Sequence, residues 1–374
     1  MSQNQFKLFN ISPLIGSSLS NFVRTLKNRK IDRSFHLKVF LSFLIVLVTT
    51  PFRWYEKAYF SFNIKSIPQP EPVFILGHWR SGTTFLHNLI CQDPKVSYVS
   101  TYQSVFPNFM ASKWLFQPLM KLTMPNHRPG DNMKLAVDLP QEEEFALSNT
   151  GPISYYNFFY FPKMYGEYYQ KCIRLDGQSN RSITRFNDAY NLLLKKACLP
   201  TDSSRIVIKN PANTGRIDWL LKNYPQAKFI HIHRNPYEVY VSTKKFYTQL
   251  IPTLWFHRVS PDFIQEMIIE TYVKLYSDYL NQCTRIPAEN LIEISYEDFE
   301  KTPVDSLQTI YSHLRLPGFE KARNLFVDYA DSQRTFKKTQ HTITSKEART
   351  IDERWSKFIK LWNYDFPKNI SLSE

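Results

Sequence analysis

The sequence predicts an α/β fold of three layers, with helices on both faces of a central parallel sheet and a helical extension before it. Short apolar runs alternate along the chain with stretches of helical periodicity, a pattern typical of parallel sheets. A glycine-containing turn follows the first of these runs and leads directly into a helical stretch. The chain has 374 residues, of which 43% are hydrophobic, so it can bury the large core that such a fold requires.

Residues 1–70 are predicted to form an N-terminal helical extension, followed by one larger domain over residues 71–374. The extension contains an apolar run, residues 39–52. This run is shorter than the ~20 residues of a membrane-spanning helix, and it begins too late for an ordinary signal peptide. The flanking Lys38 and Arg53 have side chains long enough to reach lipid headgroups. We therefore expect a buried helix, or a helix in peripheral contact with a membrane interface, rather than a spanning one.

Four short apolar runs are predicted to be the strands of the sheet, and each is followed by a helical stretch. Because the runs read as strands buried on both faces, the sheet is expected to be parallel and covered by helices. Longer helical insertions interrupt this alternation. The predicted strands are residues 73–76, 205–209, 228–233 and 291–295, with helices at 83–91, 217–224, 237–247 and 304–314 and insertions at 103–123, 139–150, 180–198, 261–283 and 346–361.

The turn after the first predicted strand has the spacing of a P-loop. Gly77 and Gly82 lie five residues apart and lead into a helix, whose first backbone amides and dipole attract an anion. A nucleotide triphosphatase needs a lysine after the second glycine, where this sequence has Thr83. No acidic residue closes a later strand to hold Mg²⁺. The pattern therefore indicates a P-loop-like site for an anion bound without a metal.

A second anion-binding group is predicted at the end of the strand over residues 228–233. Arg234 follows this strand, Pro236 starts a helix, and Ser242 lies about two helical turns further on. Both polar side chains can then face one pocket at the carboxyl edge of the sheet. A guanidinium group suits a phosphate there because its donors form a fork.

Taken together, these motifs resemble those of the sulfotransferases that use 3′-phosphoadenylyl sulfate (PAPS), in the branch with the motif Arg-Ser-Gly-Thr-Thr. The resemblance runs from about residue 72 to 341, with each motif in the expected strand-to-helix context. It implies an enzyme that moves a sulfuryl group from PAPS, as co-substrate, to a hydroxyl or amine. The acceptor would be a lipid-like, carbohydrate or other small molecule. No metal is implied.

The resemblance also implies how the nucleotide is held. Arg80 would contact the transferred group, the following residues the 5′-phosphate, and Arg234 with Ser242 the 3′-phosphate. Tyr296 would contact the adenine, although a place in the core explains it equally well, and Phe85 carries the same alternative. A basic loop late in the chain would close over the 3′-phosphate. The cofactor-binding set is Arg80, Ser81, Gly82, Thr83, Thr84, Phe85, Arg234, Ser242, Tyr296, Lys337 and Lys338.

Catalysis would need cations on the leaving oxygens and a base for the incoming hydroxyl. Arg80 and Lys209, at the end of the second strand, resemble the family's cations. The histidine that serves as base in soluble hormone-type members is replaced by Pro211. The base is instead expected among Glu142, Glu143 and Glu144, with Glu142 favoured and Glu144 next. An acidic first helical turn is the simpler alternative for these residues, and His78 and His127 are further candidates for the base.

The charge balance favours a phosphorylated ligand. The net charge is +14, and no zinc-finger spacing, RNA-binding signature or compact basic run indicates nucleic acid. Four unpaired cysteines are typical of a reducing compartment, which favours a cytoplasmic location or the inner membrane surface, although three N-x-S sequons leave the Golgi lumen open. Two alternatives stay open: a P-loop kinase-like phosphotransferase, and an inactive adaptor with a sulfotransferase fold. The sequence does not indicate an oligomeric state.

Overall fold

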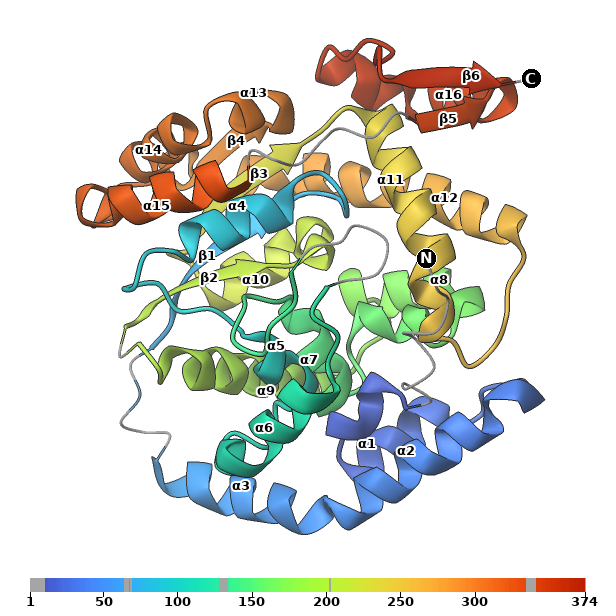
Figure 1. Cartoon of the computed structure of the whole chain (residues 1–374), viewed down its shortest axis with the longest axis vertical. Helices are drawn as coiled ribbons and strands as arrows, with labels where there is room; N and C mark the ends of the chain where they lie inside the picture. Colours follow the sequence, from blue (N-terminus) through green and yellow to red (C-terminus); the bar gives the residue numbers. More distant parts are fainter. Residues whose placement is uncertain are drawn as a thin grey trace. The chain divides into compact units, whose positions relative to one another are not determined.

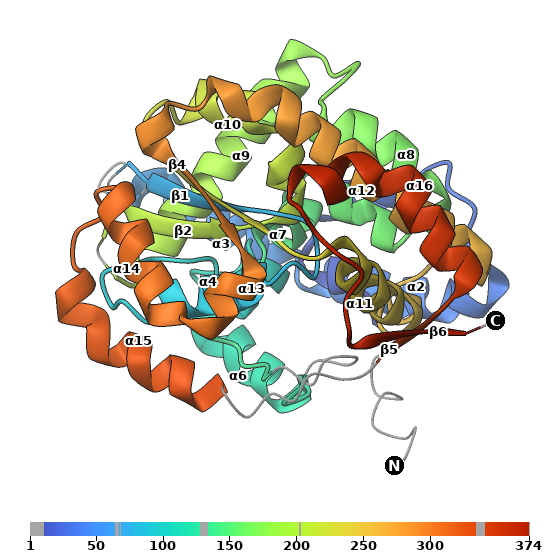
Figure 2. The ribbon, with the colours of Figure 1, turned by 90° about the horizontal axis from the view of Figure 1, so that it is seen from above.

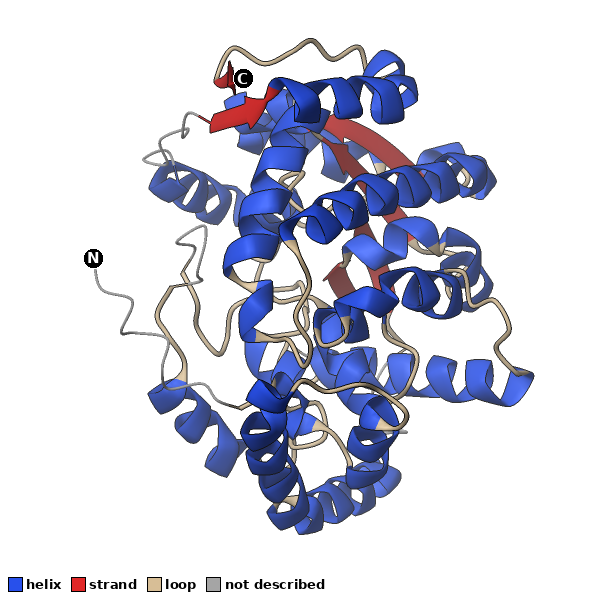
Figure 3. Cartoon of the chain, turned by 90° about the vertical axis from the view of Figure 1, so that its right-hand side faces the viewer, coloured by secondary structure: helices blue, strands red, loops and turns tan. Residues whose placement is uncertain are grey.

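The computed structural model describes residues 11–63, 67, 69–127, 134–201, 203–333 and 341–373. The chain divides into two compact units. The helical unit comprises residues 1–70, 99–199 and 249–260, and the sheet unit comprises residues 71–98, 200–248 and 261–374. Residues 1–70 thus pack together with segments that follow the first strand. Figure 3 shows that helices predominate and that the strands are few.

The core of the sheet unit is a parallel sheet, as predicted. Its strands occur in the order β2-β1-β3-β4, and every neighbouring pair runs parallel. Three strands have the predicted bounds, and the first begins two residues earlier than predicted. The strands are β1 (Glu71–Leu76), β2 (Arg205–Lys209), β3 (Lys228–His233) and β4 (Leu291–Ser295).

Helices cover both faces of this sheet (Figure 2). Alternate side chains of a strand point to opposite faces. Val73 and Ile75 therefore join one apolar cluster with α4 (Thr83–Ile90), α13 (Tyr296–Lys301), α14 (Pro303–His313) and α15 (Phe319–Gln333). Phe74 points to the other face, where its ring stacks on the ring of Phe229 with the ring centres 5.6 Å apart. That face is covered by α10 (Ile217–Asn223) and α12 (Pro261–Gln282). The three-layer α/β fold is confirmed.

The strand order creates a switch point between β1 and β3. The chain leaves β1 towards β2 on one side, whereas it leaves β3 towards β4 on the other. In parallel α/β sheets, ligands bind beyond the carboxyl ends of the strands at such a point. The turn Gly77–Gly82 follows β1 and Arg234 follows β3, so the two predicted anion-binding groups flank the switch point.

The sheet unit also contains elements outside the main parallel sheet and the helices that cover it. β5 pairs with β6 in a small parallel sheet that the sequence did not predict. Thr344 and Glu347 form a capping box at the start of α16. These elements are α11 (Pro236–Gln249), β5 (His341–Thr344), α16 (Ser345–Leu361), β6 (Ile370–Ser373) and the short turns Pro211–Gly215, Cys283–Arg285 and Ala288–Asn290.

The helical unit is built from short helices around an aromatic cluster that includes Tyr102, Phe109 and Phe116. The predicted helix over residues 103–123 is wrong as one element: α5 ends at Val105 and α6 begins at Lys113. Pro107 explains the interruption, because the residue before a proline avoids the helical conformation. The helices are α1 (Leu19–Leu26), α2 (His36–Val48), α3 (Thr50–Asn63), α5 (Thr101–Val105), α6 (Lys113–Thr123), α7 (Glu143–Thr150), α8 (Tyr165–Tyr168) and α9 (Asn180–Cys198), with short turns at Pro13–Gly16, Arg33–Phe35, Tyr155–Phe159, Pro162–Met164, Tyr169–Ile173 and Ile251–Thr253.

The apolar run over residues 39–52 falls on α2 and the start of α3 (Figure 1). In the part of the chain that the structure describes, no single helix is both long and apolar enough to cross a membrane. The segments Arg33–Val48 and Thr50–Phe62, bent by 48° at their junction, meet the criteria of length and composition only as a pair.

A buried ion pair ties α3 to α9 within the helical unit. Lys196 Nζ donates to a carboxylate oxygen of Glu56, and both side chains are almost completely buried. Lys196 also donates to the carbonyl oxygen of Pro107 at 3.2 Å, and the second carboxylate oxygen of Glu56 accepts from the amide of Ala111 at 2.6 Å. The pair therefore links residues 1–70 to the helices that follow the first strand.

Replacing Glu56 by alanine is expected to lower the free energy of unfolding by roughly 3–5 kcal/mol, because the charge of Lys196 would stay buried without its partner. Chemical denaturation measures this change. Asp188→Ala, which removes an exposed carboxylate on the same helix as Lys196, should change the stability by less than about 0.5 kcal/mol. Equal effects of the two substitutions would contradict a structural role for the pair.

Candidate functional site

The turn after β1 has a backbone that depends on glycine. Gly82 has a φ of 91°, and a Cβ atom there would lie 2.1 Å from a ring carbon of Tyr296. Glycine is therefore required both by the left-handed conformation and by the close approach of that ring. Gly77 donates its amide to Thr214 Oγ1 at 2.8 Å, which anchors the start of the turn. Gly82 is the N-cap of α4 and provides no side-chain cap.

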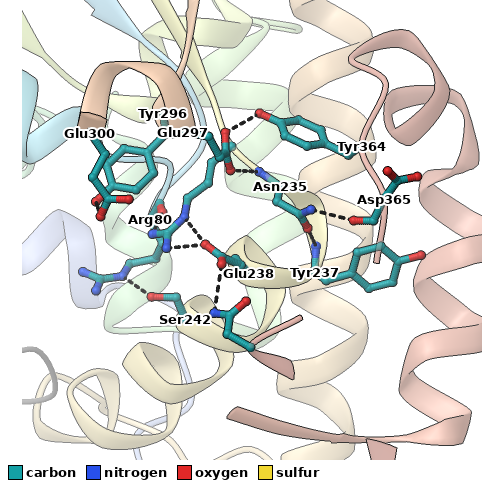
Figure 4. A network of polar contacts seen from close by, with 12 residues as sticks. Arg80, Asn235, Tyr237, Glu238, Ser242, Tyr296, Glu297, Glu300, Tyr364 and Asp365 are labelled. Atoms are coloured by element: carbon teal, nitrogen blue, oxygen red, sulfur yellow. Dashed lines mark hydrogen bonds and ion pairs between the residues drawn. The ribbon is translucent and has the colours of Figure 1, made fainter. Parts of the chain in front are cut away.

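Arg80 is the cation of this turn. It has a φ of 71°, a left-handed conformation that is strained for a residue with a side chain. Its Nε donates to Ser242 Oγ on α11 at 2.8 Å (Figure 4). The structure thus brings together two residues that the sequence assigned to opposite ends of one nucleotide.

Arg234 lies beside this pair and is held on three sides. Its guanidinium carbon is 4.4 Å from the centre of the Tyr296 ring, and its Nη1 donates to the carbonyl oxygen of Arg80 at 3.3 Å. Its Nε donates to Glu238 Oε2 at 2.7 Å. Glu238 in turn accepts from Asn369 Nδ2 at 3.0 Å. The two predicted anion-binding groups are therefore in direct contact at the switch point.

A further set of contacts fixes the strand end from which Arg234 projects (Figure 4). Glu297 accepts from the amide of Asn235 at 2.9 Å and from the Tyr364 hydroxyl at 2.8 Å. Asn235 Nδ2 donates to the carbonyl oxygen of Asp365 at 2.8 Å. The sequence analysis missed Glu238 in this role, although it lies four residues after Arg234, a recognisable ion-pair spacing. Nothing in the sequence pattern pointed to Tyr364.

Lys209 is buried at the end of β2, where it pairs in register with Ile75 of β1. It therefore lies at the same carboxyl edge as the turn after β1. His87, on α4, contacts the carbonyl oxygen of Val207 at 3.3 Å through Nε2. Burial, and then the charge of Lys209, lowers the pKa of His87 to about 3. His87 is thus neutral at ordinary pH.

His78 is also buried and neutral. Burial lowers its pKa to about 4, although a hydrogen bond with the Trp79 carbonyl oxygen opposes the shift. The distance from Nδ1 to that oxygen is 2.8 Å, so Nδ1 carries the proton and Nε2 has the free lone pair. Among the described residues, no hydrogen-bond partner of His78 Nε2 is present. This nitrogen is an unused hydrogen-bond acceptor, and burial makes it a weak base.

The other predicted cofactor-binding residues have varied surroundings. Ser81 is buried and its hydroxyl donates to the carbonyl oxygen of His78 at 2.7 Å. Thr83 is buried at the start of α4, and Thr84 is half-buried. Phe85 packs against Phe299, with ring centres 5.1 Å apart, as part of the apolar cluster. Lys337 and Lys338 lie outside the described residues.

The three glutamates considered for the base lie in the helical unit at the start of α7. Glu144 is buried and accepts from the amide of Tyr155 at 2.6 Å. Glu143, also buried, accepts from the Tyr190 hydroxyl at 3.0 Å. Glu142 is the N-cap of α7, is only partly buried, and accepts from the Tyr156 hydroxyl. Glu142 is therefore the most accessible of the three. His127, in the same unit, is exposed.

The arrangement at the switch point suits a phosphorylated ligand. The first backbone amides of α4 have no side-chain cap, because the N-cap residue is Gly82. The cations Arg80, Arg234 and Lys209 lie at the same edge of the sheet. In the described ranges, no three His, Cys, Asp or Glu side chains are grouped as a metal site requires. The fold and the site define a P-loop-like α/β protein of the group-transfer class.

The chain belongs to the sulfotransferase family, whose model matches residues 72–321. The chain is 29% identical over 359 residues to the Omega-hydroxy-beta-dihydromenaquinone-9 sulfotransferase Stf3 of Mycobacterium bovis and of Mycobacterium tuberculosis, covering 94% of this chain and 91% of each relative. It resembles the crystal structure of sulfotransferase STF9 from Mycobacterium avium with a TM-score of 0.65 at 15% identity, over 95% of this chain and 98% of that one. Sulfotransferase STF1 from Mycobacterium tuberculosis gives the same TM-score of 0.65 and 15% identity, over 92% and 94%. These structures share the fold.

The buried His87 predicts how stability depends on pH. An unfolded histidine takes up a proton as the pH falls below about 6.5, whereas His87 in the folded protein stays neutral until the pH approaches about 3. The contribution of His87 to the free energy of unfolding is therefore fully present above about pH 6.5, and it is lost as the pH falls from about 6.5 towards 3. Between pH 8 and pH 5, His87 should contribute a loss of about 2 kcal/mol.

The substitution His87→Gln should remove this contribution to the pH dependence of stability, because glutamine does not titrate. Glutamine can still donate a hydrogen bond to the Val207 carbonyl oxygen. Denaturant titrations at both pH values measure the difference. His36→Gln, which replaces an exposed histidine, should leave the pH dependence as in the parent protein. An unchanged slope in His87→Gln would show that His87 is not the group concerned.

Proposed function

We propose that the protein transfers a sulfuryl group from PAPS to a hydroxyl of a lipid-like acceptor, without a metal. The observation that carries the proposal is the meeting of Arg80, Arg234 and Ser242 at the switch point, next to the first turn of α4. A ligand with two phosphate groups would find cations and hydroxyl donors there on both flanks of one crevice. The sulfotransferase family supports the same co-substrate.

The residues present fit the nucleotide in chemistry and position. The first amides of α4, with Ser81, Thr83 and Thr84, would hold the 5′-phosphate, and Arg234 with Ser242 would hold the 3′-phosphate. Tyr296, which already lies under the Arg234 guanidinium, would border the adenine. Arg80 contacts Ser242 in this structure, so its side chain would turn from that hydroxyl towards the transferred group when the nucleotide binds.

Transfer breaks the bond between sulfur and the phosphate oxygen and forms a bond between sulfur and the acceptor oxygen, whose proton goes to a base. Arg80 and Lys209 would neutralise charge on the leaving oxygens. Glu142 is the first choice for the base because it is the least buried of the three glutamates. His78 Nε2 is the alternative, since it holds an unshared lone pair and has no described partner.

The names of the relatives support an apolar acceptor. The Stf3 proteins are named for a hydroxylated menaquinone derivative, and the match covers most of both chains. We therefore propose that this chain acts on a hydroxyl carried by an isoprenoid or similarly apolar molecule rather than on a sugar or an amine. Sulfation assays with hydroxylated isoprenoids, polar sugars and amines would compare these classes.

Calorimetry with 3′-phosphoadenosine 5′-phosphate tests the nucleotide site directly. Ser242→Ala is expected to weaken binding by about tenfold to a hundredfold, since it removes a hydrogen bond to a charged phosphate. Thr248→Ala removes an exposed hydroxyl from the same helix and should bind as the parent protein does. ATP binding that requires Mg²⁺ would favour a phosphotransferase instead, and no nucleotide binding at all would favour an adaptor.

The choice of base is tested by turnover with PAPS. Glu142→Gln is expected to lower kcat by a factor of about 10² to 10⁴ while the affinity for 3′-phosphoadenosine 5′-phosphate stays unchanged. The isosteric amide keeps a hydrogen-bond acceptor for Tyr156 and removes only the proton-accepting function. If Glu142→Gln turns over normally and His78→Asn does not, the base is His78.

A further inference from the structure

Helices α2 and α3 of the helical unit expose large apolar side chains along one face each. On α2, Leu37, Phe40, Leu44 and Leu47 recur every three or four positions, as one face of a helix requires. Trp54 is 70% exposed and Phe62 is 84% exposed, which is unusual for side chains of this size. The exposed set, called here the apolar face, is Leu37, Phe40, Leu44, Leu47 and Val48 on α2 and Trp54, Tyr55, Tyr59 and Phe62 on α3.

The opposite sides of the same helices are buried and carry charged or polar groups. Lys38 donates to the Thr253 carbonyl oxygen at 2.6 Å, Arg53 donates to the carbonyl oxygens of Val46 and Ile15 at 2.8 Å, and Glu56 pairs with Lys196. A helix on the surface of a water-soluble domain normally has its apolar stripe inward and its charges outward. In α2 and α3 this order is largely reversed, so the apolar face fits an apolar environment outside the protein.

The charged residues of the segment that carries the apolar face are almost all positive. Residues 11–63 contain eight Lys and Arg but only two acidic residues. One of the two acids, Glu56, is buried in its ion pair, and the other, Asp32, accepts from the amide of Arg258 at 2.8 Å. The exposed cations are Arg24, Lys27, Lys30, Arg33 and Lys57.

We propose that the apolar face docks on the surface of an anionic lipid bilayer, with α2 and α3 lying in the plane of the membrane interface. Trp and Tyr prefer the level of the headgroups, and the aliphatic side chains would enter the acyl boundary. The exposed lysines and arginines would lie against lipid phosphates, as charge complementarity requires. A protein partner would not need this combination of aromatic, aliphatic and exclusively cationic exposure. The proposal does not depend on the sulfotransferase activity.

Co-sedimentation of the full chain with vesicles tests this docking. Vesicles of equal parts phosphatidylcholine and phosphatidylglycerol should bind the protein at least about tenfold more strongly than vesicles of phosphatidylcholine alone. The triple variant Trp54→Ser, Tyr59→Ser, Phe62→Ser should lower the partition coefficient by at least about tenfold. The matched control Leu325→Ser, Leu361→Ser, Leu372→Ser changes three exposed leucines of the sheet unit and should bind vesicles as the parent protein does.

The charged component has its own variant. Lys27→Gln, Lys30→Gln, Arg33→Gln should remove most of the preference for the anionic vesicles, while leaving the weaker binding to phosphatidylcholine unchanged. Thermal unfolding of each variant should match the parent protein, because all the altered side chains are exposed.

Three results would overturn the proposal. The first is equal vesicle binding by the parent protein and the Trp54, Tyr59, Phe62 variant. The second is a parent protein that is dimeric without lipid and becomes monomeric in that variant, which would make the apolar face an interface between two copies. The third is retention in the vesicles after alkaline carbonate extraction, which would indicate insertion across the bilayer instead of docking on its surface.

Discussion

The contact between Tyr296, Gly82 and Arg234 holds the site together. The Tyr296 ring, at the end of β4, lies against Gly82 in the turn after β1 and under the guanidinium of Arg234 at the end of β3. Three strand ends are thus joined by one side chain. A cation over an aromatic face is worth about 0.5–2 kcal/mol, and the same contact fixes the turn after β1 and the end of β3 next to each other. Burial raises the pKa of Tyr296, so the ring stays neutral beneath the cation.

The charge at this edge of the sheet is set by groups that do not titrate near neutral pH. Arginine keeps its proton throughout the physiological range, and Arg80 and Arg234 are both at the edge. The histidines around them are kept neutral: burial lowers the pKa of His78 and of His233 to about 4, and that of His87 to about 3. These three histidines therefore add no positive charge to this edge of the sheet from pH 6 to 8.

Local sequence patterns were sufficient to predict the parallel sheet and the polar residues at the carboxyl ends of its strands. Three local signals are contained within a few neighbouring residues: an apolar strand that ends in Lys209, an apolar strand followed by Arg234, and the two glycines of the turn. The contacts that orient these groups were not predictable in the same way. Asn369 supports Glu238 across 131 positions of the chain, and Tyr364 supports Glu297 across 67. Such pairs exist only after the chain has folded.

The same limit applies to α2 and α3. The apolar composition of residues 39–52 was visible in the sequence, but the side that each residue faces depends on partners elsewhere. Arg53 faces inward because its guanidinium donates to the carbonyl oxygens of Val46 and Ile15. The break between the two helices leaves the carbonyl oxygen of Val46 without a helical backbone partner.

Lys38 faces inward for a comparable reason. The carbonyl oxygen of Thr253 accepts from its ammonium group, and burial lowers its pKa to about 8. Burying a charge is costly unless it is hydrogen-bonded. Lys38 and Arg53 therefore need the backbone acceptors that the segment 249–260 and the break between α2 and α3 provide. Because each helix has only one inward side, satisfying its charges there turns its large apolar side chains outward. The exposed apolar face is therefore a direct consequence of how the buried cations are paired.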